Sequence, residues 1–150
     1  MGSGAYKARK ATAGAKVSVI ADHIHSVAMV YPDLDDSITV TAEDDVTTWT
    51  LGPLVEIVPA DTITEPFDIH FLFIASISNN SEYQLNLYQG AGDELIAEIP
   101  FTREGVQDGA VRPLVVMTPM IPAGARIRAA LASAADNGET VTIKVGYHTY

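Results

Sequence analysis

The sequence contains no cysteine, so its fold depends neither on disulfide bonds nor on thiolate metal ligands. No apolar run approaches the roughly 20 residues that a membrane-spanning helix needs, and we expect no membrane partner. Charged residues make up only 19% of the 150 positions, whereas 47% are hydrophobic. This composition is typical of a folded globular chain and not of a disordered one, and its length suits a single domain.

Positive charge is missing from most of the chain. Residues 17–102 contain fifteen acidic residues and no lysine or arginine, and the net charge is −10. A body this acidic repels phosphate groups, so we expect no nucleic-acid partner. Residues 1–16 differ, because they carry four cations and no acid. These cations are Lys7, Arg9, Lys10 and Lys16.

The organisation that follows is a basic arm and one folded domain. Residues 1–16 are rich in glycine, alanine and lysine and show no apolar periodicity, so we interpret them as a flexible N-terminal arm. The arm is either solvated or lies on an acidic partner. Residues 17–150 are predicted to form a single β-sandwich domain.

Convincing helix signals are also scarce. Instead, apolar residues recur at every second position in most segments, which is typical of β-strands. In residues 67–78 we predict that Phe67, Ile69, Phe71, Phe73, Ala75 and Ile77 share one face of a central strand. The sequence GAGD at 90–93 predicts a hairpin turn. Pro100, in the strand that follows this turn, predicts an edge position or a bulge there. The strand-like stretches are residues 17–31, 37–42, 47–58, 67–78, 82–89, 94–103 and 111–118.

The alanine-rich residues 125–134 fit a helix or a strand. Alanine favours a helix, and Ile127 and Leu131 have helical spacing. No capping residue precedes them, however, and Arg126 and Arg128 would face the positive end of the helix dipole. We therefore predict a strand, joined to residues 141–145 as a hairpin through an Asn-Gly turn. Its inward residues are Ile127, Ala129, Leu131 and Ser133, and its outward residues are Arg126, Arg128, Ala130 and Ala132.

Together these patterns predict an all-β protein, an antiparallel β-sandwich of jelly-roll type with eight to ten short strands. His23 and His25 would point the same way from a strand and could share a metal ion, as an HxH pair does in the cupin enzymes. The glycine and glutamate of the cupin pattern are missing, so we expect ordinary strand histidines. The acidic residues 33–36 and 43–45 lack the spacing of a Ca²⁺ loop and are expected to be solvated turns.

No motif for nucleophilic, nucleotide-dependent or zinc chemistry is present in the sequence. We therefore expect no catalytic, cofactor-binding or metal site, and no enzyme. For Trp49, the one tryptophan, we favour a core position over an interface anchor. Arg126 and Arg128, beside the small Ala130 and Ala132, are either solvated or suited to an acidic partner. The candidate partner-contact residues are Lys7, Arg9, Lys10, Lys16, Trp49, Arg126 and Arg128.

Two stretches carry a resemblance to a known group. They are residues 55–103 and residues 121–150, which include IPAGARI at 121–127 and YHTY at 147–150. They resemble small virion structural proteins of tailed bacteriophages, especially head decoration or cement proteins. The resemblance implies a β-sandwich, often a homotrimer, that binds the major capsid protein on the outside of the assembled head.

The same resemblance implies a virion location, at the capsid surface, after synthesis in the host cytoplasm. It brings no catalytic motif with it. The alternative is a head-spike or tail accessory module that binds host-surface glycans.

Overall fold

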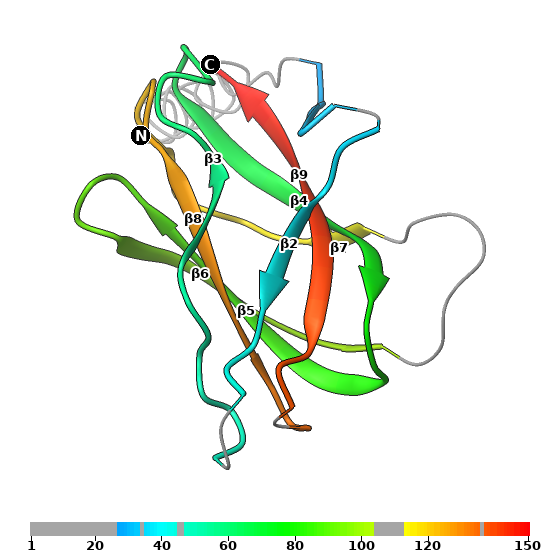
Figure 1. Cartoon of the computed structure of the whole chain (residues 1–150). Helices are drawn as coiled ribbons and strands as arrows, with labels where there is room; N and C mark the ends of the chain where they lie inside the picture. The colour runs from blue at the N-terminus through cyan, green and yellow to red at the C-terminus, as the bar shows by residue number, and fades with distance from the viewer. Residues whose placement is uncertain (1–26, 34, 45–46, 104–112, 136) are drawn as a thin grey trace, which may run out of the picture.

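The computed structural model describes residues 27–33, 35–44, 47–103, 113–135 and 137–150 (Figure 1). None of the elements in these ranges is a helix that could cross a membrane. Their nine strands are β1 (Met29–Tyr31), β2 (Ile38–Thr41), β3 (Val55–Val58), β4 (Phe67–Ile77), β5 (Ser81–Gln89), β6 (Glu94–Arg103), β7 (Pro113–Val115), β8 (Ile127–Ser133) and β9 (Thr140–Thr149).

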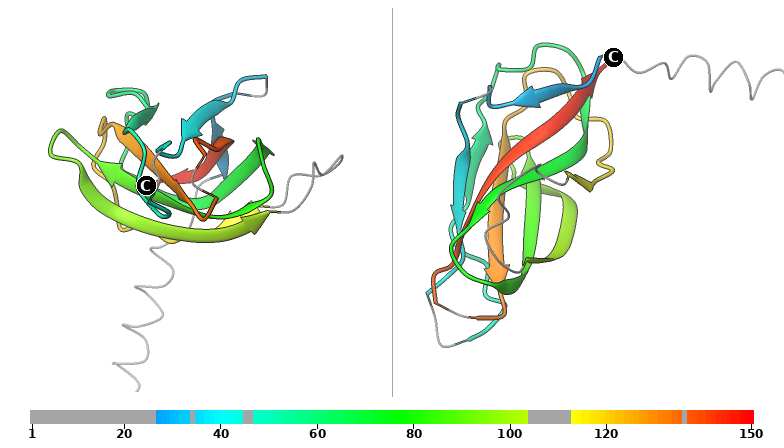
Figure 2. Two further views of the ribbon diagram at one scale, coloured as in Figure 1. Left: turned by 60° about the horizontal axis from the view of Figure 1, so that its bottom comes forward. Right: turned by 90° about the vertical axis from the view of Figure 1, so that its right-hand side faces the viewer.

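The strands form two antiparallel sheets packed against each other (Figure 2). In sheet A, β9 and β4 are central, β7 forms one edge, and β1 and β2 lie one after the other along the far side of β9. Sheet B has the order β3-β8-β5-β6. The orders β2-β9-β4-β7 and β3-β8-β5-β6 are those of a jelly roll, which confirms the predicted fold class.

The core lies between the two sheets. Sheet A contributes the fully buried Phe67, Ile69, Leu72 and Ile143, and sheet B contributes Tyr83, Leu85, Leu87 and Leu131. Burying an aliphatic or aromatic side chain of this size stabilises a fold by roughly 1.5–3 kcal/mol. The Tyr83 and Phe101 rings stack with centroids 5.3 Å apart, which ties β5 to its neighbour β6.

The hairpin predicted for the last 26 residues is wrong, although both of its strands exist. β8 pairs with β3 and β5 in sheet B, whereas β9 pairs with β4, β1 and β2 in sheet A. The connection between them crosses from one sheet to the other. At its two ends Ala134 N donates to Glu82 O and Ser78 N donates to Thr140 O, so each strand keeps the partners of its own sheet.

The face predicted for β4 is correct for Phe67 and Ile69, and again for Ile77 after a second register shift between Ile74 and Ser76, but not for Phe71 and Phe73. The register against β9 shifts between Ile69 and Phe71, which is a β-bulge at His70. One extra residue reverses the alternation. Leu72 and Ile74 therefore point into the core, and Phe71 and Phe73 lie half-buried on the outer face of sheet A.

Residues 47–58 form a shorter strand than predicted, because only Val55–Val58 is extended in a ladder. The preceding segment passes from sheet A to sheet B beside the bridge between Ala42 and Leu131. Gly52 N donates to Leu131 O, and a Cβ atom at Gly52 would lie 2.0 Å from the Thr41 carbonyl oxygen. This crossover needs glycine. Of the predicted strand at 17–31, residues 17–26 lie outside the described ranges, as do residues 1–16.

Candidate functional site

The outer face of sheet A carries an apolar row across four strands. Val30 of β1 is opposite Gly146 of β9, which is opposite Phe71 of β4, which in turn is opposite Val115 of β7. Directly opposed residues place their side chains on the same face of a sheet. Val30 is 42% exposed and Val115 is 77% exposed, so both ends of the row are open to solvent.

Gly146 allows the aromatic residues of the row to lie close to the β9 backbone. A Cβ atom at this position would be 3.1 Å from Phe71 Cβ and 3.0 Å from Phe73 Cε2. The two phenylalanine rings have centroids 6.3 Å apart. The missing side chain therefore leaves space over β9 that the two rings fill.

The apolar surface continues along the chain beyond β7. Val116 is buried, and its backbone N–H donates to His70 O, so the segment stays attached to β4. Met117 returns to the surface with 84% exposure, and Met120 is 58% exposed. Methionine is adaptable in shape and is enriched at protein interfaces.

The rest of this face has little charge. Hydroxyl side chains occupy the half of the face near β2, where Ser76 Oγ and Thr142 Oγ1 are 2.6 Å apart. Lys144 lies opposite Phe73. Asp68 carries the one carboxylate among the described strand residues of this face. In a chain of net charge −10, such a depletion of carboxylates is typical of the core of a protein interface.

Asp68 itself belongs to a compact polar cluster at one end of the face. Tyr150 Oη donates to Asp68 Oδ2 over 2.6 Å, and His70 Nε2 lies 2.9 Å from Asp68 Oδ1. The His70 and His148 rings have centroids 4.5 Å apart. Burial, the hydrogen bond to Asp68 and the charge of Asp68 together raise the pKa of Tyr150 to about 12. The phenol therefore stays protonated and keeps donating to Asp68 at neutral pH.

The outer face of sheet B is different in character. Gln84 Nε2 donates to Asn86 Oδ1, and Asn86 Nδ2 donates to Tyr88 Oη, so a polar ladder runs along β5. Exposed carboxylates surround this ladder. They are those of Glu56, Glu82 and Glu98. Sheet B thus presents a hydrated, acidic surface, opposite in character to that of sheet A.

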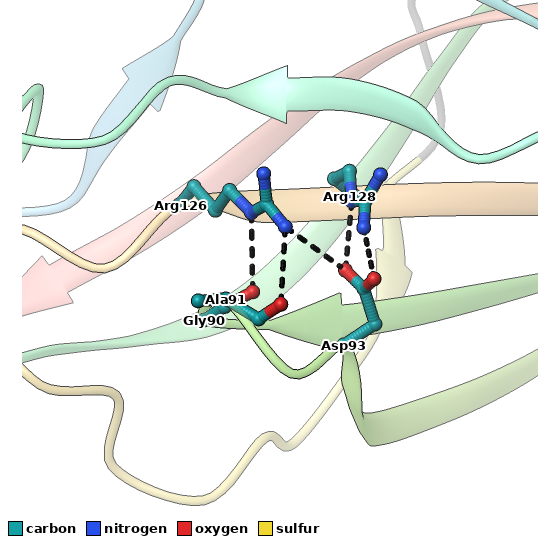
Figure 3. A network of polar contacts seen from close by, with 5 residues as sticks. All are labelled: Gly90, Ala91, Asp93, Arg126 and Arg128. Atoms are coloured by element: carbon teal, nitrogen blue, oxygen red, sulfur yellow. Dashed lines mark hydrogen bonds and ion pairs between the residues drawn. The ribbon is translucent and has the colours of Figure 1, made fainter.

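Arg126 and Arg128 hold the turn between β5 and β6 against β8 (Figure 3). Arg126 Nε donates to Gly90 O over 3.1 Å, and Arg128 Nε donates to Asp93 Oδ1 over 2.7 Å. Arg128 Nη2 also pairs with Asp93 Oδ2, and Arg126 Nη2 lies 3.7 Å from Asp93 Oδ1. Both guanidinium groups are thus engaged within the chain.

Ala130 and Ala132 lie beside these arginines, but they are 2% and 3% exposed and not open as predicted. The amide ladder on β5 stands directly opposite, because Asn86 pairs with Ala130 and Gln84 pairs with Ala132. Contact of Arg126 and Arg128 with a partner stays a prediction.

Trp49 does not occupy the core position that the sequence favoured. It is 47% exposed, has a φ of 65°, and its backbone N–H donates to Ser133 O. Leu51 and Leu54, in the same segment, are 39% and 40% exposed. Contact of Trp49 with a partner stays a prediction.

The remaining candidates from the sequence lie outside the described residues. These are Lys7, Arg9, Lys10, Lys16, His23 and His25. In the ranges that the structure does describe, no group of three or more His, Asp or Glu side chains is placed to hold a metal ion. The apolar row was not predicted from the sequence, because it depends on the bulge at His70. The glycine at 146, amid large strand residues, was the available signal.

Comparison with known proteins gives one structural similarity. Neither a family model nor a curated protein sequence matches the chain. A chain in the structure of the infectious bursal disease virus Gt strain is similar at a TM-score of 0.40 and 10% sequence identity. The similarity covers 83% of this chain and 32% of the viral one, so this chain spans about a third of that protein's length.

Proposed function

We propose that this chain is a non-enzymatic structural protein of a virus particle. It acts as a decoration protein of a tailed-phage head, docks on the major capsid protein and bridges coat subunits. The observation that carries the proposal is the apolar, charge-poor outer face of sheet A in an otherwise acidic molecule. The resemblance of residues 55–103 and 121–150 to decoration proteins supports the same role.

Docking through sheet A follows from the properties of the two faces. Exposed apolar side chains such as Val115 and Met117 are hydrated in the free protein, and burying them on a partner is favourable. The acidic face of sheet B remains in solvent and favours solubility before assembly. The protein would therefore lie with sheet A towards the capsid and sheet B outwards.

A homotrimer fits the edges of the sandwich. β7 pairs with β4 on one side and has no second strand partner among the described strands. Open edge strands tend to pair with other chains, and a ring of three copies is one way to cover them. We therefore propose three copies at each docking site.

Co-sedimentation with undecorated capsids tests this role. Val115→Glu places a charge in the apolar row and is expected to weaken binding at least tenfold. Leu95→Glu is the matched control, because Leu95 is an exposed apolar residue of β6 in sheet B, and it should bind like the unchanged protein. No binding by the unchanged protein, or equal loss in both variants, would refute docking through sheet A.

One observation favours the alternative, a module that binds host-surface glycans. The half-buried Phe71 and Phe73 rings lie beside each other on an outer face, where aromatic rings can pack against sugars. A glycan array separates the two roles. Specific glycan binding that Phe71→Ala abolishes, together with no capsid binding, would favour the alternative.

A further inference from the structure

An open depression lies at the end of the sandwich where the β8–β9 connection meets the β4–β5 turn. It encloses about 520 Å³, and most of its surface is polar. The lining residues are Ser78, Asn79, Asn80, Ala135, Asn137 and Glu139. Figure 1 shows both segments at the lower end of the molecule. Neither segment belongs to the apolar row.

Glu139 is the exceptional member of this set, because it is 1% exposed. Its Oε2 atom accepts hydrogen bonds from Ser133 Oγ over 2.5 Å and from Asn137 N over 3.2 Å. Its Oε1 atom is buried and has no hydrogen-bond partner among the described residues. One oxygen of the carboxylate is therefore held by the end of β8 and by the loop after it, and the other is unsatisfied.

The carboxylate is charged at neutral pH. Burial raises the pKa of Glu139, but the hydrogen bonds from Ser133 and Asn137 outweigh that effect and hold the pKa below its usual value. Within the described ranges no lysine, arginine or histidine forms an ion pair with it. Its negative charge also acts on Tyr83, whose pKa is raised by burial and further by Glu139.

A buried charge in a folded protein is normally paired or bound to a metal ion. Among the described residues, the surroundings of Glu139 supply oxygen atoms and no cation. The lining residues bring amide oxygens and a serine hydroxyl. Asp44, from a third segment, packs near the adjacent Gly138, because its Cβ lies 3.4 Å from the position of a Cβ at that glycine.

We propose that the depression is a Ca²⁺ site with Glu139 as its anionic ligand. Ca²⁺ takes six to eight oxygen ligands and accepts carboxylate, amide carbonyl and water together, whereas Mg²⁺ demands a stricter octahedron. With one carboxylate at its centre, the site should bind Ca²⁺ with low affinity, with a Kd of about 10⁻⁴–10⁻³ M. The bound ion would fasten the crossover between the sheets to the β4–β5 turn.

Thermal unfolding after treatment with a chelator tests the site. At 10 mM CaCl₂ the Tm is expected to rise by about 3–5 °C, and by less at 10 mM MgCl₂. Tb³⁺ gives a second readout, because the neighbouring Tyr83 should sensitise its luminescence and Ca²⁺ should then reduce the signal. A chain that shows neither effect has no cation site, and a buried water satisfies Oε1 instead.

Three substitutions make the test specific. Glu139→Gln should abolish both the Tm shift and the Tb³⁺ signal, whereas Glu98→Gln, on the exposed face of sheet B, should change neither. Asn137→Asp adds a carboxylate and should tighten Ca²⁺ binding about tenfold, a gain that a purely structural role for the loop does not produce. If Glu139→Gln responds like the unchanged protein, or if Asn137→Asp does not tighten binding, the proposal is overturned.

Discussion

Single side chains decide what the surface of this sandwich can bind. Asp93, an acidic turn residue, forms ion pairs with both Arg126 and Arg128, so their charges are neutralised within the chain. Its φ of 51° is tolerated by aspartate and asparagine better than by most residues. The GAGD turn was recognisable in the sequence, but its ion pair was not, because the arginines are 33 and 35 positions away.

The pairing of Asp93 with Arg128 leads to a prediction about stability. Asp93→Asn keeps a residue that accepts positive φ but removes the charge, so two guanidinium groups lose their shared counter-ion. We expect the free energy of unfolding in urea to fall by about 1 kcal/mol, because the groups are partly exposed and solvent screens them. The loss should shrink in 1 M NaCl. An equal loss at both salt concentrations would show that turn geometry, and not charge, is responsible.

At the scale of strands, local sequence patterns predicted which segments form strands. Contacts between distant parts of the chain decide which strands pair and which faces are buried. The β5–β6 hairpin was predictable, because alternation and turn residues lie within one short stretch. The partners of β8 were not, because an Asn-Gly turn serves a crossover between sheets as well as it serves a hairpin. The outer face was missed for a similar reason, since no local pattern in residues 67–77 marks the bulge at His70, and Gly146 opposite it lies far away in the sequence.

The crossover at Gly52 gives a prediction at this scale. Gly52→Ala would place a methyl group 2.0 Å from a backbone oxygen, that of Thr41, which cannot move without breaking the bridge from Ala42 to Leu131. We expect a loss of more than about 3 kcal/mol in the free energy of unfolding. Gly92→Ala is the matched control, because a Cβ there meets nothing within 4 Å. Similar Tm values for the two variants would contradict this view of the crossover.

For the whole molecule, the jelly roll separates two surfaces of different side-chain chemistry. Its strand order places β4 and β9 in one layer and β5 and β8 in the other. The apolar and hydroxyl residues of sheet A therefore collect on one side, and the amide ladder and glutamates of sheet B on the opposite side. Under the proposed function, the cations of residues 1–16 would supply a second contact of a different physical kind.

These two contacts respond differently to salt, which gives the last prediction. Binding through an apolar face depends little on ionic strength, whereas binding through Lys7, Arg9, Lys10 and Lys16 weakens as salt screens the charges. Deleting residues 1–16 should leave the Tm of the free protein unchanged, weaken capsid binding at 50 mM NaCl, and remove most of its salt dependence. Replacing only the four cations by serine is the control for chain length. A lower Tm after the deletion would place residues 1–16 in the folded domain, and binding that stays salt-dependent would assign the electrostatic contact to other cations.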